Sequence, residues 1–329
     1  MIETTLRING NLKLLGRFRD EDQTEKFVFE SPAGIIELTW VKNKKGITVF
    51  YLPTHHYCNL GCKFCHLTEE HKGIGQKMIP ISAEDLNSAM EYVINKYTGN
   101  KKVLLSFMGV GEPFLNLDLV FQLFDLNKKK KGFVFSYALA SMMLSSSGFR
   151  KIYRKMEADK IPLKIHFSLH FPFDKTRHDI IPCSKETISQ SLRRLNQYRA
   201  FVKRQKGIMA NFSMFHETTD PVEIHYTIIK GINDSDRDLD KLIGLGVKYK
   251  IPLKILKFNP TESLKRSDRE RYWFERLKKQ YGAAVAYYMP PGPNIGSSCG
   301  QFTKHYYLGS QSREQLKEFN DWKTRYEVK

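Results

Sequence analysis

The sequence lacks long apolar runs. No stretch approaches the roughly 18 apolar residues that a membrane-spanning helix needs, and the first ten residues contain no apolar segment of the signal-peptide type. We therefore expect a cytoplasmic protein with no membrane partner. Apolar residues still make up 41% of the chain, which excludes a largely disordered protein.

Acidic residues are few compared with basic ones. The 329 residues include 53 lysines and arginines against 35 aspartates and glutamates, a formal net charge of +18. A surplus of this size attracts polyanions, with nucleic acid as the first candidate and a solvated lysine-rich surface as the alternative. The candidate RNA contact is a set of six cations along one expected helix and the turn after it: Arg193, Arg194, Arg199, Lys203, Arg204 and Lys206.

Cysteine is scarce and unevenly placed. The chain has five cysteines, an odd number, and three of them fall within eight residues, which is a poor disulfide framework. These three, Cys58, Cys62 and Cys65, have no fourth cysteine nearby. Three thiolates can hold three irons of a 4Fe–4S cluster and leave the fourth iron open to another ligand. A zinc site completed by His66 is the alternative.

Hydrophobic patterning predicts an α/β fold. Three strands are expected near residues 26–31, 34–41 and 46–52, and later ones near 103–108, 133–140, 163–169, 208–215, 223–229, 252–258 and 283–289, mostly with amphipathic helices between them. Ser82 begins an expected helix whose apolar residues follow at helical spacing. Alternating strands and helices indicate a mainly parallel sheet rolled into a partial or full (β/α) barrel. We expect a small β extension at 1–50, a barrel core at 51–310 and a helix or tail at 311–329.

A second motif follows the strand expected at 103–108. The segment SFMGVGEPFLN contains Gly109, Gly111, Glu112 and Pro113 at a strand end. Glycines there let the backbone approach a ligand closely, and a buried carboxylate or carbonyl beside them can accept a hydrogen bond from an amine. A tight turn is the simpler explanation for this motif taken alone.

Together these motifs resemble a known family. The cysteine spacing, with Phe64 before the last cysteine, resembles the radical S-adenosylmethionine (SAM) superfamily. Five further segments occur in order after FMGVGEP, namely FSLHFP (167–172), IIPCSKE (180–186), IKGINDS (229–235), LKFNP (256–260) and NIGSSCGQF (294–302), and the whole set resembles the RlmN/Cfr family of RNA adenosine methyltransferases. The resemblance extends from about Lys26 to Phe302.

The resemblance implies cofactors, partners and residue roles. It implies a 4Fe–4S cluster on Cys58, Cys62 and Cys65, a SAM site, an RNA substrate and an electron donor such as flavodoxin or ferredoxin. The implied SAM-site residues are Gly111, Glu112, Ser145, Ser168, Leu169, His170 and Asn259. Cys299 matches the cysteine that the family methylates and from which it transfers the carbon to an adenine ring carbon. Glu37 matches a carboxylate proposed as proton acceptor, and a strand glutamate facing water is the alternative.

The sequence departs from the family in two ways. The family has a second essential cysteine seven residues before the first cluster cysteine, which releases product by forming a disulfide, and this chain has Tyr51 there. The leader before Glu37 also has no room for the family's N-terminal accessory domain. An enzyme derived from the family but acting on a peptide or small metabolite is therefore the alternative function. Cys183 is the one cysteine without an implied role; it is either a release thiol or a small apolar residue.

Overall fold

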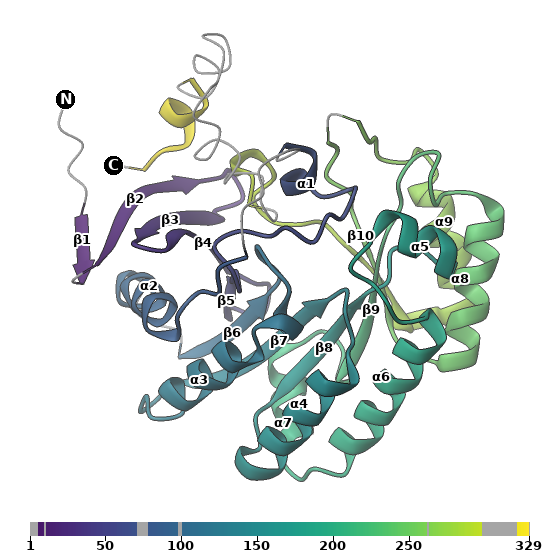
Figure 1. Cartoon of the computed structure of the whole chain (residues 1–329), viewed down its shortest axis with the longest axis horizontal. Coiled ribbons are helices and arrows are strands. Elements are labelled where there is room, and N and C mark those ends of the chain that lie inside the picture. The colour runs from purple at the N-terminus through teal and green to yellow at the C-terminus, as the bar shows by residue number, and fades with distance from the viewer. Residues whose placement is uncertain are drawn as a thin grey trace.

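A computed structural model describes residues 6–9, 11–70, 78–97, 101–261, 263–297 and 321–328. In these residues the strands form a single 11-stranded sheet in which each strand pairs with the next along the chain (Figure 1). The strands are β1 (Leu6–Asn9), β2 (Leu12–Arg19), β3 (Glu25–Ser31), β4 (Gly34–Lys42), β5 (Thr48–Tyr51), β6 (Lys102–Phe107), β7 (Val134–Ser141), β8 (Leu163–Ser168), β9 (Val222–Thr227), β10 (Leu253–Leu256) and β11 (Val285–Tyr288). Strands β1 to β5 pair antiparallel, and β5 to β11 pair parallel.

Helices cover the outer face of the parallel strands (Figure 1). The helices of the described residues are α1 (His66–Glu70), α2 (Ala83–Lys96), α3 (Leu117–Asn127), α4 (Ser146–Asp159), α5 (Asp174–Ile180), α6 (Ile188–Lys203), α7 (Ile208–Phe215), α8 (Asp236–Tyr249) and α9 (Glu270–Tyr281), with short 3-10 helices η1 (Pro113–Leu115), η2 (Gly282–Ala284) and η3 (Pro293–Ile295). This arrangement confirms the α/β fold with a curved, mainly parallel sheet.

Helix α2 shows how local sequence sets an element. Ser82 caps it by accepting a hydrogen bond from the Asp85 amide at 3.1 Å. Leu86, Met90 and Val93 are buried at three- and four-residue spacing, so one apolar face packs on the sheet. The prediction of this helix is confirmed.

The N-terminal strands continue the barrel sheet. Strand β4 pairs antiparallel with β5, which in turn pairs parallel with β6, so no break separates the extension from the barrel. The segment 321–328 returns to this region, where the rings of Trp322 and Phe18 lie 4.9 Å apart and the Val328 amide donates to Arg17 O at 2.8 Å. The boundaries at residues 50 and 310 remain predictions.

The strand predicted at residues 208–215 is wrong. These residues form α7, in which Ile208, Phe212 and Phe215 are buried at helical spacing and Gly207 begins the helix at φ 85°. A short apolar run fits a buried helix as well as a buried strand, so periodicity does not separate the two. Strands β1 and β2 had no clear signal in the sequence and were missed.

No helix in the described part of the chain is both long and apolar enough to cross a membrane.

Candidate functional site

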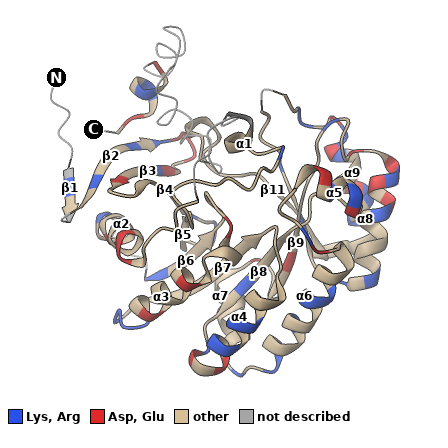
Figure 2. Ribbon diagram, viewed as in Figure 1, with Lys and Arg blue, Asp and Glu red and all other residues tan. Residues whose placement is uncertain are grey.

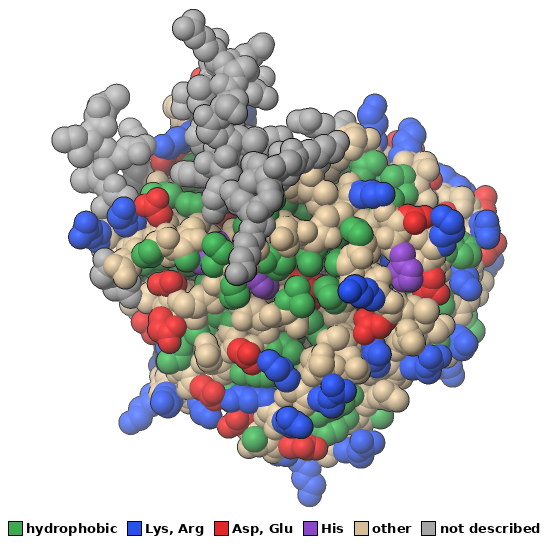
Figure 3. Space-filling view, in the orientation of Figure 1, with side chains coloured by type: hydrophobic (Ala, Val, Ile, Leu, Met, Phe, Trp, Pro, Cys, Tyr) green, Lys and Arg blue, Asp and Glu red, His purple; other side chains and the backbone are tan. Residues whose placement is uncertain are grey.

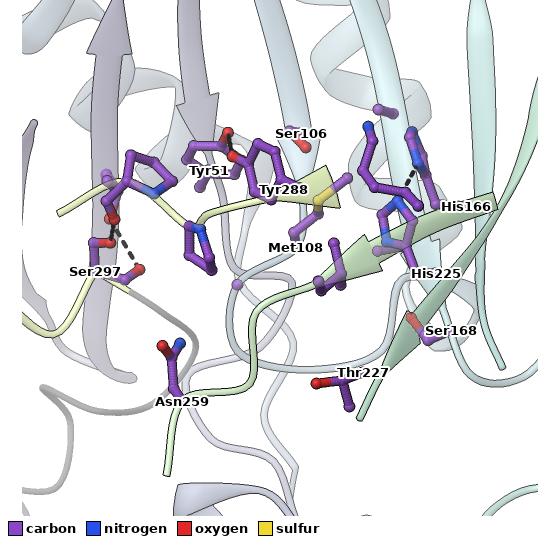
Figure 4. Close-up of a pocket in the computed structure, with 18 of the residues that line it drawn as sticks. Tyr51, Ser106, Met108, His166, Ser168, His225, Thr227, Asn259, Tyr288 and Ser297 are labelled. Carbon is purple, nitrogen blue, oxygen red and sulfur yellow. Dashed lines mark hydrogen bonds between the residues drawn. The ribbon is translucent and has the colours of Figure 1, made fainter. Parts of the chain in front are cut away.

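A cavity of about 400 Å³ lies inside the curve of the sheet (Figure 4). Ser106, Ser168 and Thr227 line it at the carboxyl ends of β6, β8 and β9. Its walls continue down the strands to His166 and Lys254. Loops after the carboxyl ends of barrel strands are the usual place for chemistry, so the cavity is the candidate active site.

The cysteine loop, which follows the carboxyl end of β5, lies at the edge of this cavity. Cys65 and His66 line it, and the loop is fastened to α5 by the Lys63 amide, which donates to Ile180 O at 2.9 Å. Burial raises the pKa of Cys58 to about 12. A hydrogen bond with Cys183, together with burial and the nearby thiol of Cys65, raises the pKa of Cys62 well above its usual value. Buried thiols of this kind become thiolates only when nearby positive charge compensates them, which bound iron provides.

The structure gives no support to the zinc alternative. Among the described residues, the three cysteines and His66 do not form a group whose ligand atoms all lie within 4.8 Å of one another. A closed tetrahedral zinc site needs such a spacing, because ligand atoms about 2.0–2.3 Å from one ion lie less than about 4 Å apart.

Cys183 lies beside Cys62 and outside the cavity lining. It packs in an apolar cluster with Cys62, Phe171 and Ile181, and a hydrogen bond with Cys62 lowers its pKa. Its surroundings favour the role of a small apolar residue over that of a thiol that acts in the cavity.

The glycine motif fits a tight backbone crossing. Gly111 has φ +102°, and a Cβ there would lie 2.4 Å from His55 Nδ1 and 2.5 Å from Thr54 Oγ1. A Cβ on Gly109 would lie 2.8 Å from the backbone of Leu52. Only glycine fits at these two positions, and Gly109 lines the cavity.

Glu112 is buried and satisfied by the protein. Its Oε1 accepts hydrogen bonds from Ser141 Oγ at 2.6 Å and the Phe114 amide at 3.0 Å, and its Oε2 accepts one from the Met142 amide at 3.0 Å. Burial raises its pKa to about 7, although these donors oppose the shift. Glu112 does not line the cavity. Through these hydrogen bonds its carboxylate links the loop after β6 to the end of β7.

The FSLHFP segment places two of its expected residues in the cavity. Ser168 and His170 line it, whereas the side chain of Leu169 is fully buried in the core. His170 has the left-handed φ of +52°, and burial lowers its pKa to about 3. The Nδ1 atom of this neutral imidazole is buried without a hydrogen-bond partner. Asn259, after β10, also lines the cavity.

Ser145 lies apart from these residues. It is the N-cap of α4, where its Oγ accepts from the Gly148 amide at 3.1 Å, and it does not line the cavity. Helix capping accounts for this serine, so a SAM contact at Ser145 remains only a prediction.

No sequence pattern indicates Arg177, although this residue holds the site together. Its guanidinium is buried and donates to Leu169 O at 3.1 Å, Ser168 O at 3.1 Å and Met142 O at 2.9 Å, and also to Ser184 Oγ. Burial lowers its pKa to about 10, so it remains charged at neutral pH. No local pattern marks such a residue, because its partners come from three different loops.

Glu37 lies in the cavity wall and is 8% exposed, so it is not a strand glutamate facing water. Its Oε2 accepts from the buried Lys26 Nζ at 2.5 Å, and the same ammonium donates to Gly296 O at 2.5 Å. Ser297 also lines the cavity, and Thr39 Oγ1 donates to its carbonyl oxygen at 3.4 Å. Cys299, two positions later, lies outside the described residues.

Tyr51 lines the cavity where β5 faces β11. Its hydroxyl hydrogen-bonds to that of Tyr288, so the two rings bridge the two ends of the parallel sheet (Figure 4). A tyrosine at this position therefore has a structural role in closing the barrel.

Comparison with known proteins identifies the family. The model of the radical SAM superfamily matches residues 52–243, more than half of the chain. The chain belongs to the radical SAM superfamily. Within the superfamily it is an RlmN/Cfr-like member: it is 28% identical to the dual-specificity RNA methyltransferase RlmN of Finegoldia magna over 85% of this chain and 74% of that protein, and 26% identical to that of Flavobacterium johnsoniae over 92% and 81%.

A solved structure shares the fold. A radical SAM methyltransferase from Sphaerobacter thermophilus superimposes with a TM-score of 0.68 at 20% identity, covering 88% of this chain and 81% of that chain. Radical SAM enzymes use a 4Fe–4S cluster and SAM, and the described residues fit both. Three thiols suit the cluster, and the unpartnered Nδ1 of His170 is available in the cavity.

Positive charge is spread over the outer helices (Figure 2). In Figure 3, lysines and arginines lie mostly around the margin of the visible face, with apolar and histidine side chains nearer its centre. Two of the six cations expected to contact RNA have structural partners: Arg194 pairs with Glu186 at 2.8 Å, and Arg199 donates to Lys250 O at 2.7 Å.

The other cations of this set are exposed but lie away from the cavity. Arg193 is on α6, and Lys203, Arg204 and Lys206 are at its end. This end of α6 lies near the amino ends of the strands, since Tyr198 one turn earlier donates to Leu163 O, the first residue of β8. Exposed Lys63 and Lys185 and the cavity residue Lys257 lie at the opposite, cysteine-loop edge. Sequence alone did not distinguish the two edges.

Proposed function

We propose that this radical SAM methyltransferase transfers a methyl-derived carbon through Cys299 to an adenosine carbon in ribosomal or transfer RNA. The observation that supports the proposal is the meeting of Glu37, Ser168, Asn259 and Ser297 around one cavity beside the cysteine loop. The curated relatives are named as RNA methyltransferases, and they match this chain over most of its length.

The cofactor residues form one rim of the cavity. Cys58, Cys62 and Cys65 hold the cluster, and Ser168, His170 and Asn259 contact SAM. When bound, these cofactors supply the radical chemistry and the carbon that the reaction needs. The shape of this rim depends on residues that hold its backbone in place, namely Gly111, Glu112, Leu169 and Arg177.

The transfer residues are Glu37 and Cys299. The Cys299 thiol carries the carbon, and Glu37 accepts a proton released during the reaction. Lys26 fixes the Glu37 carboxylate and the backbone at Gly296, so the base and the segment that leads to Cys299 are held by one ammonium. This lysine is 1% exposed, so it positions the base from the buried side of the cavity wall.

The test is anaerobic incubation of the reconstituted protein with methyl-labelled SAM and total RNA, followed by mass spectrometry of nucleosides. We expect label in a methyladenosine, and Cys299→Ala should abolish it while SAM is still cleaved. Cys183→Ala is the matched control and should retain labelling. Label confined to peptide or small-molecule fractions would favour the alternative function instead.

A further inference from the structure

A second cluster of possible metal ligands lies along β8 and β9, two residues before Ser168 and Thr227. His166 on β8 and Glu223 and His225 on β9 are at most 4% exposed, and they point to one spot between the two strands. His166 Nδ1 lies 2.7 Å from His225 Nε2 and 3.2 Å from Glu223 Oε1, and His225 Nε2 lies 3.1 Å from the same oxygen. Figure 4 shows the two imidazoles facing each other beside the cavity.

Protons alone do not satisfy this triangle. A carboxylate oxygen only accepts, so at most two protons lie inside it, one on each imidazole nitrogen. With one proton inside the triangle, the imidazole nitrogen that lacks a hydrogen and the carboxylate oxygen face each other with lone pairs. With two protons, both N–H groups reach Glu223 but point at each other across 2.7 Å. Every assignment therefore leaves one unfavourable edge in a buried place, where such an edge is costly.

A single cation removes the conflict. Three ligand atoms about 2.0–2.2 Å from one ion lie roughly 2.8–3.6 Å apart for angles between octahedral and tetrahedral, close to the observed edges. Two imidazoles and one carboxylate are a common ligand set for zinc and for ferrous iron, and they leave further positions open. We propose that His166, Glu223 and His225 bind a divalent first-row transition metal ion, with zinc as the probe ion, separate from the iron–sulfur cluster.

Two lysines adjoin the proposed site and set its affinity. Lys254 Nζ lies 2.8 Å from Glu223 Oε1, and Lys164 Nζ lies 3.7 Å from Glu223 Oε2. Lys164 also donates to Thr218 Oγ1 at 2.7 Å, which directs its charge away from the triangle. Lys254 shares the ligand oxygen, so it competes with the ion through charge repulsion without filling the space between the imidazoles.

The position of the site indicates what the ion does. His166 and His225 line the same cavity as Ser168 and Asn259. A substrate bound in this cavity therefore has oxygen or nitrogen atoms in the space next to the ion. The ion acts there as a Lewis acid that anchors a substrate heteroatom.

The test is equilibrium dialysis of the reconstituted full-length protein against micromolar zinc, with metals measured by mass spectrometry. We expect one zinc per chain in addition to the cluster iron. His166→Ala and His225→Ala should each lose it, whereas the matched control His178→Ala, outside the cavity, should retain it. Lys254→Met should lower the dissociation constant by about tenfold because the competing charge is removed.

A second measurement does not depend on the cluster or on activity. In the variant with Cys58→Ala, Cys62→Ala and Cys65→Ala, added cobalt(II) should give visible absorption bands. These bands should be absent when the same variant also carries His225→Ala. The absence of stoichiometric zinc in the wild type would overturn the proposal. So would zinc that survives both histidine variants, or zinc bound only after Lys254→Met, since Lys254 would then be the resident cation.

Discussion

Single residues decide the chemistry of this protein, and the cysteine loop is the clearest case. Cys58 and Cys62 are held in surroundings that oppose thiolate formation until metal is present. Cys183 lies beside Cys62 in the same apolar cluster but comes from a different loop. The roles of these thiols are therefore separable by single substitutions.

The triple Cys→Ala variant at 58, 62 and 65 should lose the broad absorption near about 400 nm that a thiolate-bound iron–sulfur centre gives. Cys183→Ala is the matched control, because it removes a neighbouring thiol of similar burial and should keep the full iron content. Equal loss of iron in Cys183→Ala would show that this thiol is a ligand.

Tyr51 is the residue that most separates this chain from the family it resembles. If carbon transfer leaves substrate attached to Cys299, no thiol at position 51 is available to release it. We expect the wild type to stall as a covalent adduct or to need added thiol, and Tyr51→Cys to increase turnover several-fold in the absence of thiol. Intact-mass spectrometry during turnover measures the adduct.

Two controls accompany that measurement. Tyr51→Phe removes the hydrogen bond to Tyr288 without adding a thiol, and it should not relieve the stall. Cys183→Ala should change nothing, since Cys183 does not line the cavity. Repeated turnover by the wild type and by Cys183→Ala without thiol would mean that release follows another route.

At the scale of elements, β2 and β3 are joined by a buried ion pair. Arg17 Nε lies 2.5 Å from Glu25 Oε2, and the Glu25 side chain is 2% exposed. Burial acts to raise the pKa of Glu25, but hydrogen bonds from Arg17, Tyr97 and Arg19 outweigh it and hold the pKa below its usual 4.5. The same two strands also share an exposed pair, Lys13 with Glu30 at 3.1 Å.

Glu25→Gln should lower the free energy of unfolding by about 3–5 kcal/mol, because Arg17 is left buried without its counter-charge. The exposed pair provides the control: Glu30→Gln should cost less than about 1 kcal/mol. Urea unfolding of cluster-free protein measures both. Similar costs for the two substitutions would contradict this account of β2 and β3.

The pH dependence of the Glu25 effect has a definite sign. A carboxyl whose folded pKa is depressed stabilises the fold above its unfolded pKa and loses that contribution as pH falls through the folded pKa. The stability difference between wild type and Glu25→Gln should therefore be largest above about pH 4.5 and shrink below it. A constant difference across this range would mean that Glu25 ionisation does not contribute.

At the scale of the whole molecule, the curve of the sheet separates two sets of cations. Lys63, Lys185 and Lys257 lie at the edge that holds the cysteine loop and the cavity, whereas Lys203, Arg204 and Lys206 follow α6 at the other edge. An RNA that places an adenosine in the cavity passes close to the first set and away from the second.

Charge reversal of Lys63, Lys185 and Lys257 to Glu should weaken RNA binding and reduce the slope of log affinity against log salt by roughly 2, from the loss of three phosphate contacts. Reversal of Lys203, Arg204 and Lys206 introduces the same change in net charge and should leave the slope nearly unchanged. Filter binding over a salt series measures both slopes. Equal effects would point to non-specific attraction by net charge.

The sequence by itself determined the motifs and most of the elements. The spacing of Cys58, Cys62 and Cys65, the glycines at 109 and 111, and the order of later segments led to the family, because these signals are local and survive without knowledge of the fold. The helix from Ala83 followed from its cap and its apolar spacing. Local patterns failed for α7, where an apolar run suits both a strand and a buried helix.

Only the tertiary structure decided which distant residues meet. It brings together residues that are far apart in the sequence or on neighbouring strands. Examples are the contacts of Arg177 with three loop carbonyls, of Lys26 with both Glu37 and Gly296, and of His166 with His225. It also assigned Ser145 to a helix cap and placed half of the expected RNA contact at the edge of the barrel away from the cavity. Such facts depend on strand register and on the direction each helix runs, which is fixed by packing over the whole sheet and not by any local stretch of residues.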